Sequence, residues 1–222
     1  MAEPLLPHVN LAQLWAASGE TLYMTALAGV ATGIVGLMLG MALFLTARGG
    51  LFHRPVVYGV LSVVVNVFRS IPFIILIVLL IPFTKVVIGT ILGANAALPA
   101  LIVGAAPFYA RLVEIALREV DRGVIEASRA MGARTGTLIF RVLLPESSPA
   151  LVSGITVTLI ALVSYSAMAG VIGAGGLGNL AYLEGFQRNH NDVTLVATAM
   201  ILIIVFAIQL LGDIVTSLLD KR

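Results

Sequence analysis

Long apolar stretches separated by short charged links dominate the chain. A helix needs about 20 mostly apolar residues to cross the hydrocarbon core of a bilayer, where every backbone amide must bond within its own segment. Five stretches meet this requirement, at about residues 22–46, 56–83, 96–116, 150–172 and 193–212. Ser148 and Pro149 are predicted as the N-cap and first residue of the fourth stretch. The pattern therefore predicts an all-α membrane protein with five transmembrane helices.

The composition agrees with a membrane protein. Of the 222 residues, 59% are hydrophobic and 11% are charged, whereas an average soluble domain carries about 25% charged residues. So few charges cannot cover a water-facing surface, and we expect a single membrane domain over residues 1–222. The first basic residue is Arg48, so the apolar run before it lacks the positive flank of a secretory signal and is interpreted as mature sequence.

The basic residues predict how the chain is oriented. Short cytoplasmic links of membrane proteins carry the excess of Lys and Arg. The first link holds Arg48 and Arg54 and the third holds five arginines, while the alternate links hold only Lys85 and Arg188. The chain also ends in Lys221 and Arg222. This alternation predicts an N-terminus outside the cell and a C-terminus in the cytoplasm.

Within the third link, about residues 122–145 carry a helical hairpin pattern. Residues 124–131 predict a short helix that ends at Gly132, and residues 135–142 predict a second amphipathic piece that turns at Pro145 into the next span. Apolar side chains such as Ala127 and Met131 stand among the arginines, which suits docking into a groove of another protein. Periodicity alone leaves open an interfacial loop whose arginines contact anionic lipid headgroups.

The spacing within this link resembles the EAA loop of ABC importer permeases. That loop has a Glu-Ala-Ala, a downstream glycine and an Ile-x-Leu-Pro ending. The matching residues here are Glu126, Ala127, Gly132, Leu144 and Pro145, while Ser128 and Val142 replace an Ala and an Ile. The resemblance implies a coupling helix that seats on a separate ATPase subunit. It assigns ATPase coupling to Glu126, Ala127, Ser128, Met131, Gly132, Leu144 and Pro145.

A wider resemblance covers nearly the whole chain and is to the methionine-importer branch of these permeases. It is carried by segments 20–25, 66–73, 81–84, 104–108, 164–170 and 173–178. The resemblance implies a type I ABC importer permease fold and a methionine importer, for the D- or L-form or both, in the bacterial inner membrane. It further implies a second copy of the chain, two ATPase subunits that bind ATP and Mg, and an extracytoplasmic methionine-binding protein. This chain itself would bind no cofactor, no metal and no nucleic acid.

Four residues are candidates for the translocation pathway: Asn66, Arg69, Tyr165 and Met168. Arg69 interrupts the second span, and a charge inside a membrane segment is a functional candidate. The competing interpretation is that it reaches toward the cytoplasmic face, because it lies nearer that end of its predicted span. Tyr165 and Met168 either line or gate the pathway or pack between helices. Arg111 and Glu114, three residues apart, are expected to form a structural ion pair.

Glycines form two further patterns. Gly29 with Gly33, and Gly36 with Gly40, have the spacing that lets helices approach closely in lipid, and we expect close packing there. Residues 173–178 satisfy G-x-G-x-x-G, but no strand precedes them and no acidic residue follows at the distance that dinucleotide binding requires. A flexible external turn is the expected structure.

Other classes of protein receive less support from the sequence. No P-loop exists, because neither Lys85 nor Lys221 follows the glycine pattern of a nucleotide-binding loop. The three histidines lie in different links without metal-ligand spacing. The remaining alternatives are a permease for another amino acid or small solute, an autonomous channel or secondary transporter, and a membrane-embedded enzyme, for which the spans supply no catalytic pair.

Overall fold

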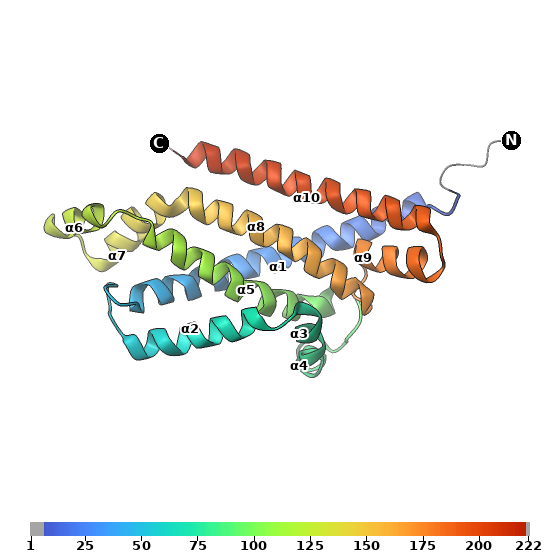
Figure 1. The fold of residues 1–222 in the computed structure, drawn as a ribbon, viewed down its shortest axis with the longest axis horizontal. Helices are drawn as coiled ribbons and strands as arrows, with labels where there is room; N and C mark the ends of the chain where they lie inside the picture. The colour runs from blue at the N-terminus through green and yellow to red at the C-terminus, as the bar shows by residue number, and fades with distance from the viewer. Residues whose placement is uncertain (1–6, 221–222) are drawn as a thin grey trace.

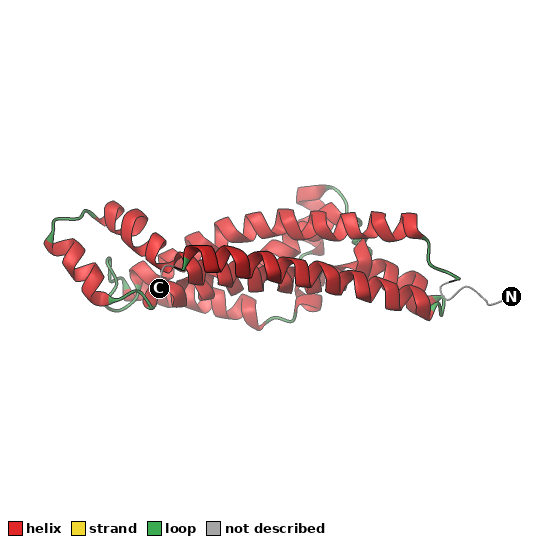
Figure 2. Cartoon of the chain, turned by 90° about the horizontal axis from the view of Figure 1, so that it is seen from above, coloured by secondary structure: helices red, strands yellow, loops and turns green. Residues whose placement is uncertain are grey.

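A computed structural model describes residues 7–220 of the chain and contains helices but no strands in that range. The four longest, α1, α5, α8 and α10, run side by side along the molecule, and α2 lies against α5 (Figures 1 and 2). The helices are α1 (Leu11–Thr46), α2 (Pro55–Ser70), α3 (Phe73–Leu79), α4 (Ile81–Ile88), α5 (Ala94–Arg118), α6 (Arg122–Ala130), α7 (Thr135–Leu138), the π-helix η1 (Ile139–Leu143), α8 (Leu144–Val171), α9 (Gly176–Leu180), the π-helix η2 (Ala181–Gln187) and α10 (Asn191–Leu219). The expected all-α fold is confirmed for the described residues.

Four helices are long and apolar enough to span a membrane, and a fifth span results if the bent pair α2 and α3 is taken as one. The third predicted span lies within α5 and differs from it by two residues at each end. The first and fifth predicted spans are too short, because α1 begins at Leu11 and α10 continues to Leu219. Asn10 starts α1 by accepting hydrogen bonds from the amides of Ala12 and Gln13.

The second predicted span is not one continuous helix. Between α2 and α3 the chain bends by 105°. The bend falls at Ile71 and Pro72, where Ile71 is extended with ψ 123°. Proline has no amide to continue the helix and disfavours helical geometry in the residue before it. The helix is therefore fully broken at Pro72, and α3 and α4 turn aside from the long axis of the bundle (Figure 1).

The start of the fourth span was predicted at the wrong place. Helical structure runs without interruption from Thr135 to Val171, so Ser148 and Pro149 lie inside a helix and no turn occurs at Pro145. The Ser148 hydroxyl donates to the Pro145 carbonyl at 2.7 Å, the acceptor that the missing amide of Pro149 leaves free. Before Pro145, the π-helix η1 widens the backbone ladder. These two devices let the helix continue through both prolines.

Close packing of α1 through its glycines is confirmed, and the two pairs face different neighbours. A Cβ at Gly36 would lie 3.0 Å from the Ala106 carbonyl oxygen, so this end of α1 meets the backbone of α5. A Cβ at Gly40 would clash with the Ala110 carbonyl oxygen in the same way. Gly29 and Gly33 instead face leucine and isoleucine side chains of α8. Small residues thus allow α1 to pack on α5 at backbone distance.

Gly40→Ala is expected to destabilise the fold by about 1–3 kcal/mol, because the added methyl overlaps a carbonyl that cannot move without shifting α5. Gly33→Ala is the matched control, since its methyl would meet only Ile155 at an ordinary 3.6 Å. Thermal unfolding of the purified protein measures both. Equal unfolding temperatures for the two variants would show that the α1–α5 contact tolerates the extra volume.

The glycine-rich segment 173–178 is a packed turn, so the expectation of a flexible one is wrong. The amide of Gly176 donates to Glu20 Oε2 at 2.6 Å and that of Leu177 donates to Thr21 Oγ1 at 2.9 Å. Gly176 has φ +79°, a conformation that side chains rarely adopt. The segment is therefore tied to α1 and begins the short helix α9.

Candidate functional site

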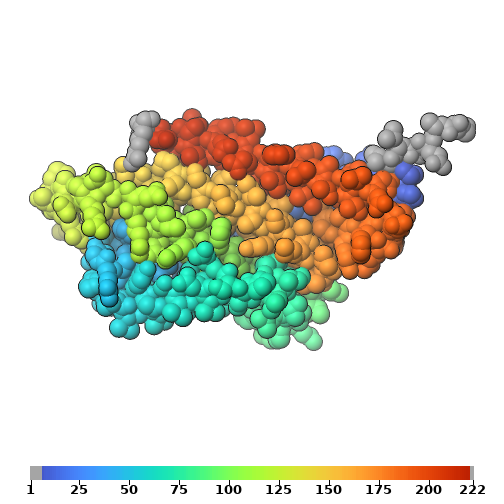
Figure 3. All heavy atoms as spheres, viewed as in Figure 1, coloured from blue at the N-terminus to red at the C-terminus, as the bar shows by residue number. Residues whose placement is uncertain are grey.

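The predicted hairpin lies at one end of the molecule, which we call the hairpin end, opposite the end that holds α9 (Figures 1 and 3). It comprises α6, the turn at Gly132, α7 and η1, residues 122–143. Asp121 caps α6 by accepting from the Gly123 amide at 2.6 Å. Gly132 has φ +83°, and the following amide, of Ala133, donates back to the Ser128 carbonyl. The expected helix, glycine stop and second helical piece are thus all present.

The hairpin has one face held by the bundle and one face free. Leu138 and Leu143 are fully buried and belong to a hydrophobic cluster with Val113 and Leu117 of α5. On the free side, Met131 is 82% exposed and Phe140 is 69% exposed. Large apolar side chains exposed on a short projecting hairpin are typical of a docking surface. Phe140 was missed by the motif comparison, although an aromatic residue within an amphipathic helix could have indicated it.

The structure divides the predicted coupling residues into exposed and buried ones. Glu126 and Ala127 are exposed on α6, and so is Gly132 at the turn. Ser128 is buried and its hydroxyl donates to the Val124 carbonyl at 2.7 Å, so it faces the bundle and cannot belong to the free face. The last two predicted residues lie apart from the turn.

These two residues, Leu144 and Pro145, begin α8. Leu144 is half-buried and Pro145 is exposed. They therefore connect the hairpin to the long helix, whereas the free face is formed by residues of α6, the turn and η1.

A cavity of about 710 Å³ lies behind α6, between it and the ends of α1, α2 and α5. Glu126 is the one carboxylate among its lining residues. Four guanidinium groups also line it, those of Arg48, Arg118, Arg122 and Arg129. The hairpin end is therefore strongly cationic on this side, as the distribution of basic residues in the sequence predicts.

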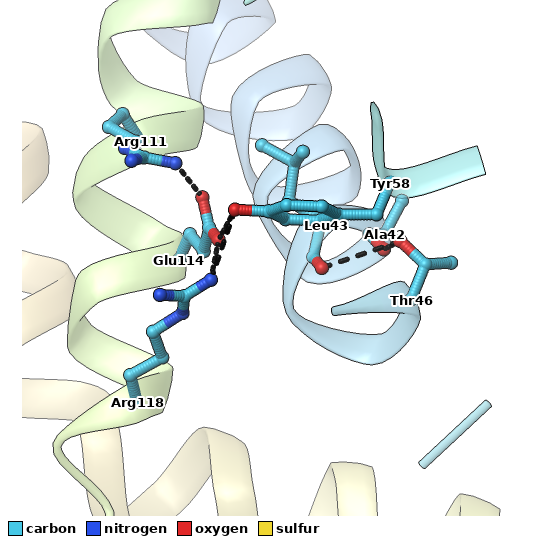
Figure 4. A network of polar contacts seen from close by, with 7 residues as sticks. All are labelled: Ala42, Leu43, Thr46, Tyr58, Arg111, Glu114 and Arg118. Atoms are coloured by element: carbon cyan, nitrogen blue, oxygen red, sulfur yellow. Dashed lines mark hydrogen bonds and ion pairs between the residues drawn. The ribbon is translucent and has the colours of Figure 1, made fainter. Parts of the chain in front are cut away.

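A buried carboxylate ties α2 to α5 close to this cavity. Glu114 is 1% exposed, and Arg111 donates to its Oε2 at 2.6 Å while Arg118 donates to its Oε1 (Figure 4). The Tyr58 hydroxyl, from α2, lies 3.3 Å from the same Oε1. The expected pair of Arg111 and Glu114 is confirmed, and the sequence missed its two further members. Both carboxylate oxygens are thereby satisfied within the protein.

Two of the four predicted pathway residues meet in one cavity. This cavity of about 250 Å³ lies where α2 breaks, and its lining residues include Arg69 from α2 and Tyr165 from α8. The Tyr165 ring stacks on that of Phe73 with centroids 4.4 Å apart. We call it the break cavity. It combines an exposed cation with walls formed by buried and half-buried aromatic side chains.

The other two pathway candidates do not line this cavity. Asn66 is exposed on α2, and Met168 is 45% exposed on α8, three residues beyond Tyr165. The interpretation that Arg69 reaches toward the cytoplasmic face stays a prediction. Arg69 lies at the last turn of α2, whereas Pro55, the first residue of that helix, lines the large cavity at the hairpin end.

The sequence of this chain matches the family described as binding-protein-dependent transport system inner membrane component over residues 32–222. The chain belongs to this family, a class of multi-pass membrane permeases. The spans, the projecting hairpin and the family match together place it in the bacterial inner membrane.

Individual relatives are more informative about the branch. The chain is 62% identical to the methionine import system permease protein MetP of Bacillus subtilis, with all of both chains covered. It is 46% identical to the probable D-methionine transport system permease protein MetI of Pasteurella multocida, over 91% of this chain and 94% of the relative. The family resemblance stated from the sequence is thus confirmed.

Solved structures give the same result for the fold. The chain is similar to a chain of the MetNI methionine ABC transporter in an inward-facing conformation, with a TM-score of 0.91 and 44% identity over the whole of both chains. A more distant likeness, to an amino acid ABC transporter with histidines, has a TM-score of 0.79 at 20% identity over 98% and 99% of the two chains and concerns the fold alone. The type I ABC permease fold expected from the sequence is confirmed.

Proposed function

We propose that this chain is the permease subunit of an ATP-driven importer that carries methionine, in the D- or L-form or both, across the inner membrane. The observation that carries the proposal is the 62% identity to a methionine import permease along the full length of both chains. The proposed unit of function is the whole of residues 1–222, a single permease domain whose coupling loop covers about residues 122–145.

The hairpin end is proposed to face the cytoplasm, with the N-terminus outside. Its arginines support this orientation, since short cytoplasmic segments carry the basic residues. Residues 221 and 222, which the same argument places in the cytoplasm, lie outside the described part of the structure. On this side the exposed Glu126, Ala127, Met131 and Gly132 would seat in a groove of an ATPase subunit.

The complete importer is proposed to contain two copies of this chain, two ATPase subunits and an extracytoplasmic methionine-binding protein, in a bilayer of membrane lipid. ATP and Mg would be bound by the ATPase subunits, and this chain would perform no covalent chemistry. Lines of exposed apolar side chains on α2 and α10, including Val60, Val63, Phe206 and Leu210, support burial against lipid or a second copy. Asn66, Arg69, Tyr165 and Met168 remain the proposed pathway residues.

Uptake by right-side-out membrane vesicles tests the proposal. Vesicles that contain this chain, its ATPase and the binding protein are expected to accumulate labelled methionine when ATP is enclosed, and to accumulate none without the ATPase. A requirement for external ATP would contradict the proposed orientation. Uptake that persists without any ATPase would instead indicate an autonomous transporter.

A permease for another amino acid or small solute is the second candidate, because a permease fold alone does not specify the solute. Competition in the same vesicles separates the two. Excess unlabelled methionine is expected to abolish the signal, while a panel of other amino acids leaves most of it. Stronger competition by another solute would identify that solute, and not methionine, as the substrate.

A further inference from the structure

The break cavity has the composition of a binding site for a small organic molecule. Its aromatic walls are formed by Phe68, Phe73, Phe108 and Tyr165, and its one charged lining residue is Arg69. Its volume of about 250 Å³ accommodates several water molecules or a compact solute. Ligand sites in proteins are mostly apolar with a small number of polar groups that fix orientation. The break cavity follows this rule.

Arg69 has no partner of opposite charge among the described residues. Over residues 7–220, no hydrogen bond or ion pair satisfies its guanidinium. Its position about 14 residues along α2 places it about 21 Å from the start of that helix. An arginine side chain cannot reach the hairpin end over this distance, so in the proposed orientation Arg69 would not reach the cytoplasmic face. Arg69 is exposed on α2. A cation that lies along a membrane segment without a partner of its own calls for an anionic one.

The broken helix supplies acceptors beside this cation. α2 ends at Ser70, and the last four carbonyls of a helix have no partner within it. The carbonyls of residues 67–70 receive no hydrogen bond from another described segment. The next residues do not serve them, because the Ile71 amide makes no capping hydrogen bond and Pro72 has no amide proton. A helix end of this kind carries partial negative charge and suits a cation such as an ammonium group.

The aromatic walls complete the site for an apolar side chain. Phe73 and Tyr165 stack with an interplanar angle of 5°, which presents a continuous apolar surface. A Cβ at Gly104 would come within 3.2 Å of the Phe73 ring, so the absence of a side chain at Gly104 leaves room for that ring. A thioether contacts aromatic rings favourably because sulfur is polarisable.

We propose that the break cavity binds a free zwitterionic amino acid with an apolar side chain during its passage through the permease. Arg69 binds the carboxylate, the carbonyl end of α2 accepts from the ammonium group, and the aromatic walls contact the side chain. The proposal rests on the function proposed above and specifies how the solute is held within this chain.

Protection of a single cysteine tests the site directly, because the native chain contains no cysteine. Phe108→Cys places a thiol in the cavity wall of the permease assembled with its ATPase. Millimolar methionine is expected to slow labelling by a small thiol reagent about tenfold, as an occupied site excludes the reagent. Methioninol, which has an alcohol in place of the carboxylate, is expected to protect about tenfold less, since it lacks the charge-assisted contact.

Charge variants in the Phe108→Cys background identify the anchor. Arg69→Gln is expected to remove protection by methionine, and Arg69→Lys to retain part of it because the charge stays while the planar fork is lost. Lys85→Gln removes a cation on α4, outside the cavity, and is expected to leave protection intact. The labelling rate without ligand reports whether each variant keeps the shape of the cavity.

The outcomes distinguish the site from the function. Vesicles that import methionine while methionine gives no protection, or while methioninol protects equally, would overturn the site and leave the importer standing. Full protection in Arg69→Gln would overturn the role of Arg69. Protection by a different amino acid in a complex that does not import methionine would refute the proposed substrate and support the site for another zwitterion.

Discussion

Ala127→Glu is expected to separate the ATPase from the permease and to lower methionine uptake by about tenfold or more. Ala127 is exposed on α6 beside Glu126. In the proposed complex this small side chain lies in the interface, where an added carboxylate would be buried without a partner and repelled by its neighbour. Retention of the ATPase during affinity purification of the permease measures the first effect, and vesicle uptake measures the second.

The matched control is Ala12→Glu, at an exposed position in the first turn of α1, at the end of the molecule remote from the hairpin. A glutamate at a helix N-terminus is tolerated because it complements the helix dipole. Both substitutions are on exposed helix surface, so the isolated permease should change in stability by no more than about 0.5 kcal/mol in either case. Equal recovery of the ATPase with both variants would disprove the assignment of the hairpin as the docking element.

Arg111→Leu combined with Arg118→Leu is expected to destabilise the permease by about 3–5 kcal/mol. The change leaves the Glu114 carboxylate buried with only the Tyr58 hydroxyl beside it. Removing the partners of a buried charge is strongly destabilising, because the remaining ion is desolvated and no opposite charge compensates it. Thermal unfolding of the purified complex in one detergent measures the difference.

A triple variant that adds Glu114→Leu is the informative comparison. It replaces the whole charged network by apolar side chains and should regain most of the lost stability. Arg188→Leu serves as the second control, because the pair of Arg188 and Glu184 lies at the surface and should contribute at most about 1 kcal/mol. A double variant that unfolds at the wild-type temperature would show that the two arginines do not stabilise the buried Glu114.

Hydropathy predicted where membrane segments lie better than where helices begin and end. The third span was placed within two residues at each end because its apolar run and its helix coincide. α1 extends about a further 11 residues before its predicted start, because a helix can continue past Glu20 into water, where apolar content is not required. The break after Ser70 depends on Pro72, whose effect on the direction of the chain is set by packing against α5 and α8.

The hairpin was predictable because its glycine, its helix and its motif are local in the sequence. The burial of Ser128 against the bundle was not predicted, since a motif match does not say which side of a short amphipathic helix is covered. Arg69 and Tyr165 line one cavity although they are nearly 100 positions apart in the sequence, which no periodicity reveals. The network of Glu114 with Tyr58 was missed for the same reason.

The uninterrupted helix from Thr135 to Val171 has a mechanical consequence for an importer coupled in the proposed way. Between Thr135, next to the hairpin turn, and Tyr165, in the break cavity, it forms a rod of about 45 Å with no hinge loop. A rod of this kind acts as a lever. In the proposed importer, displacement of its tip by an ATPase subunit would tilt the far arm, so the aromatic wall of the cavity would move as the two ATPase subunits close and separate.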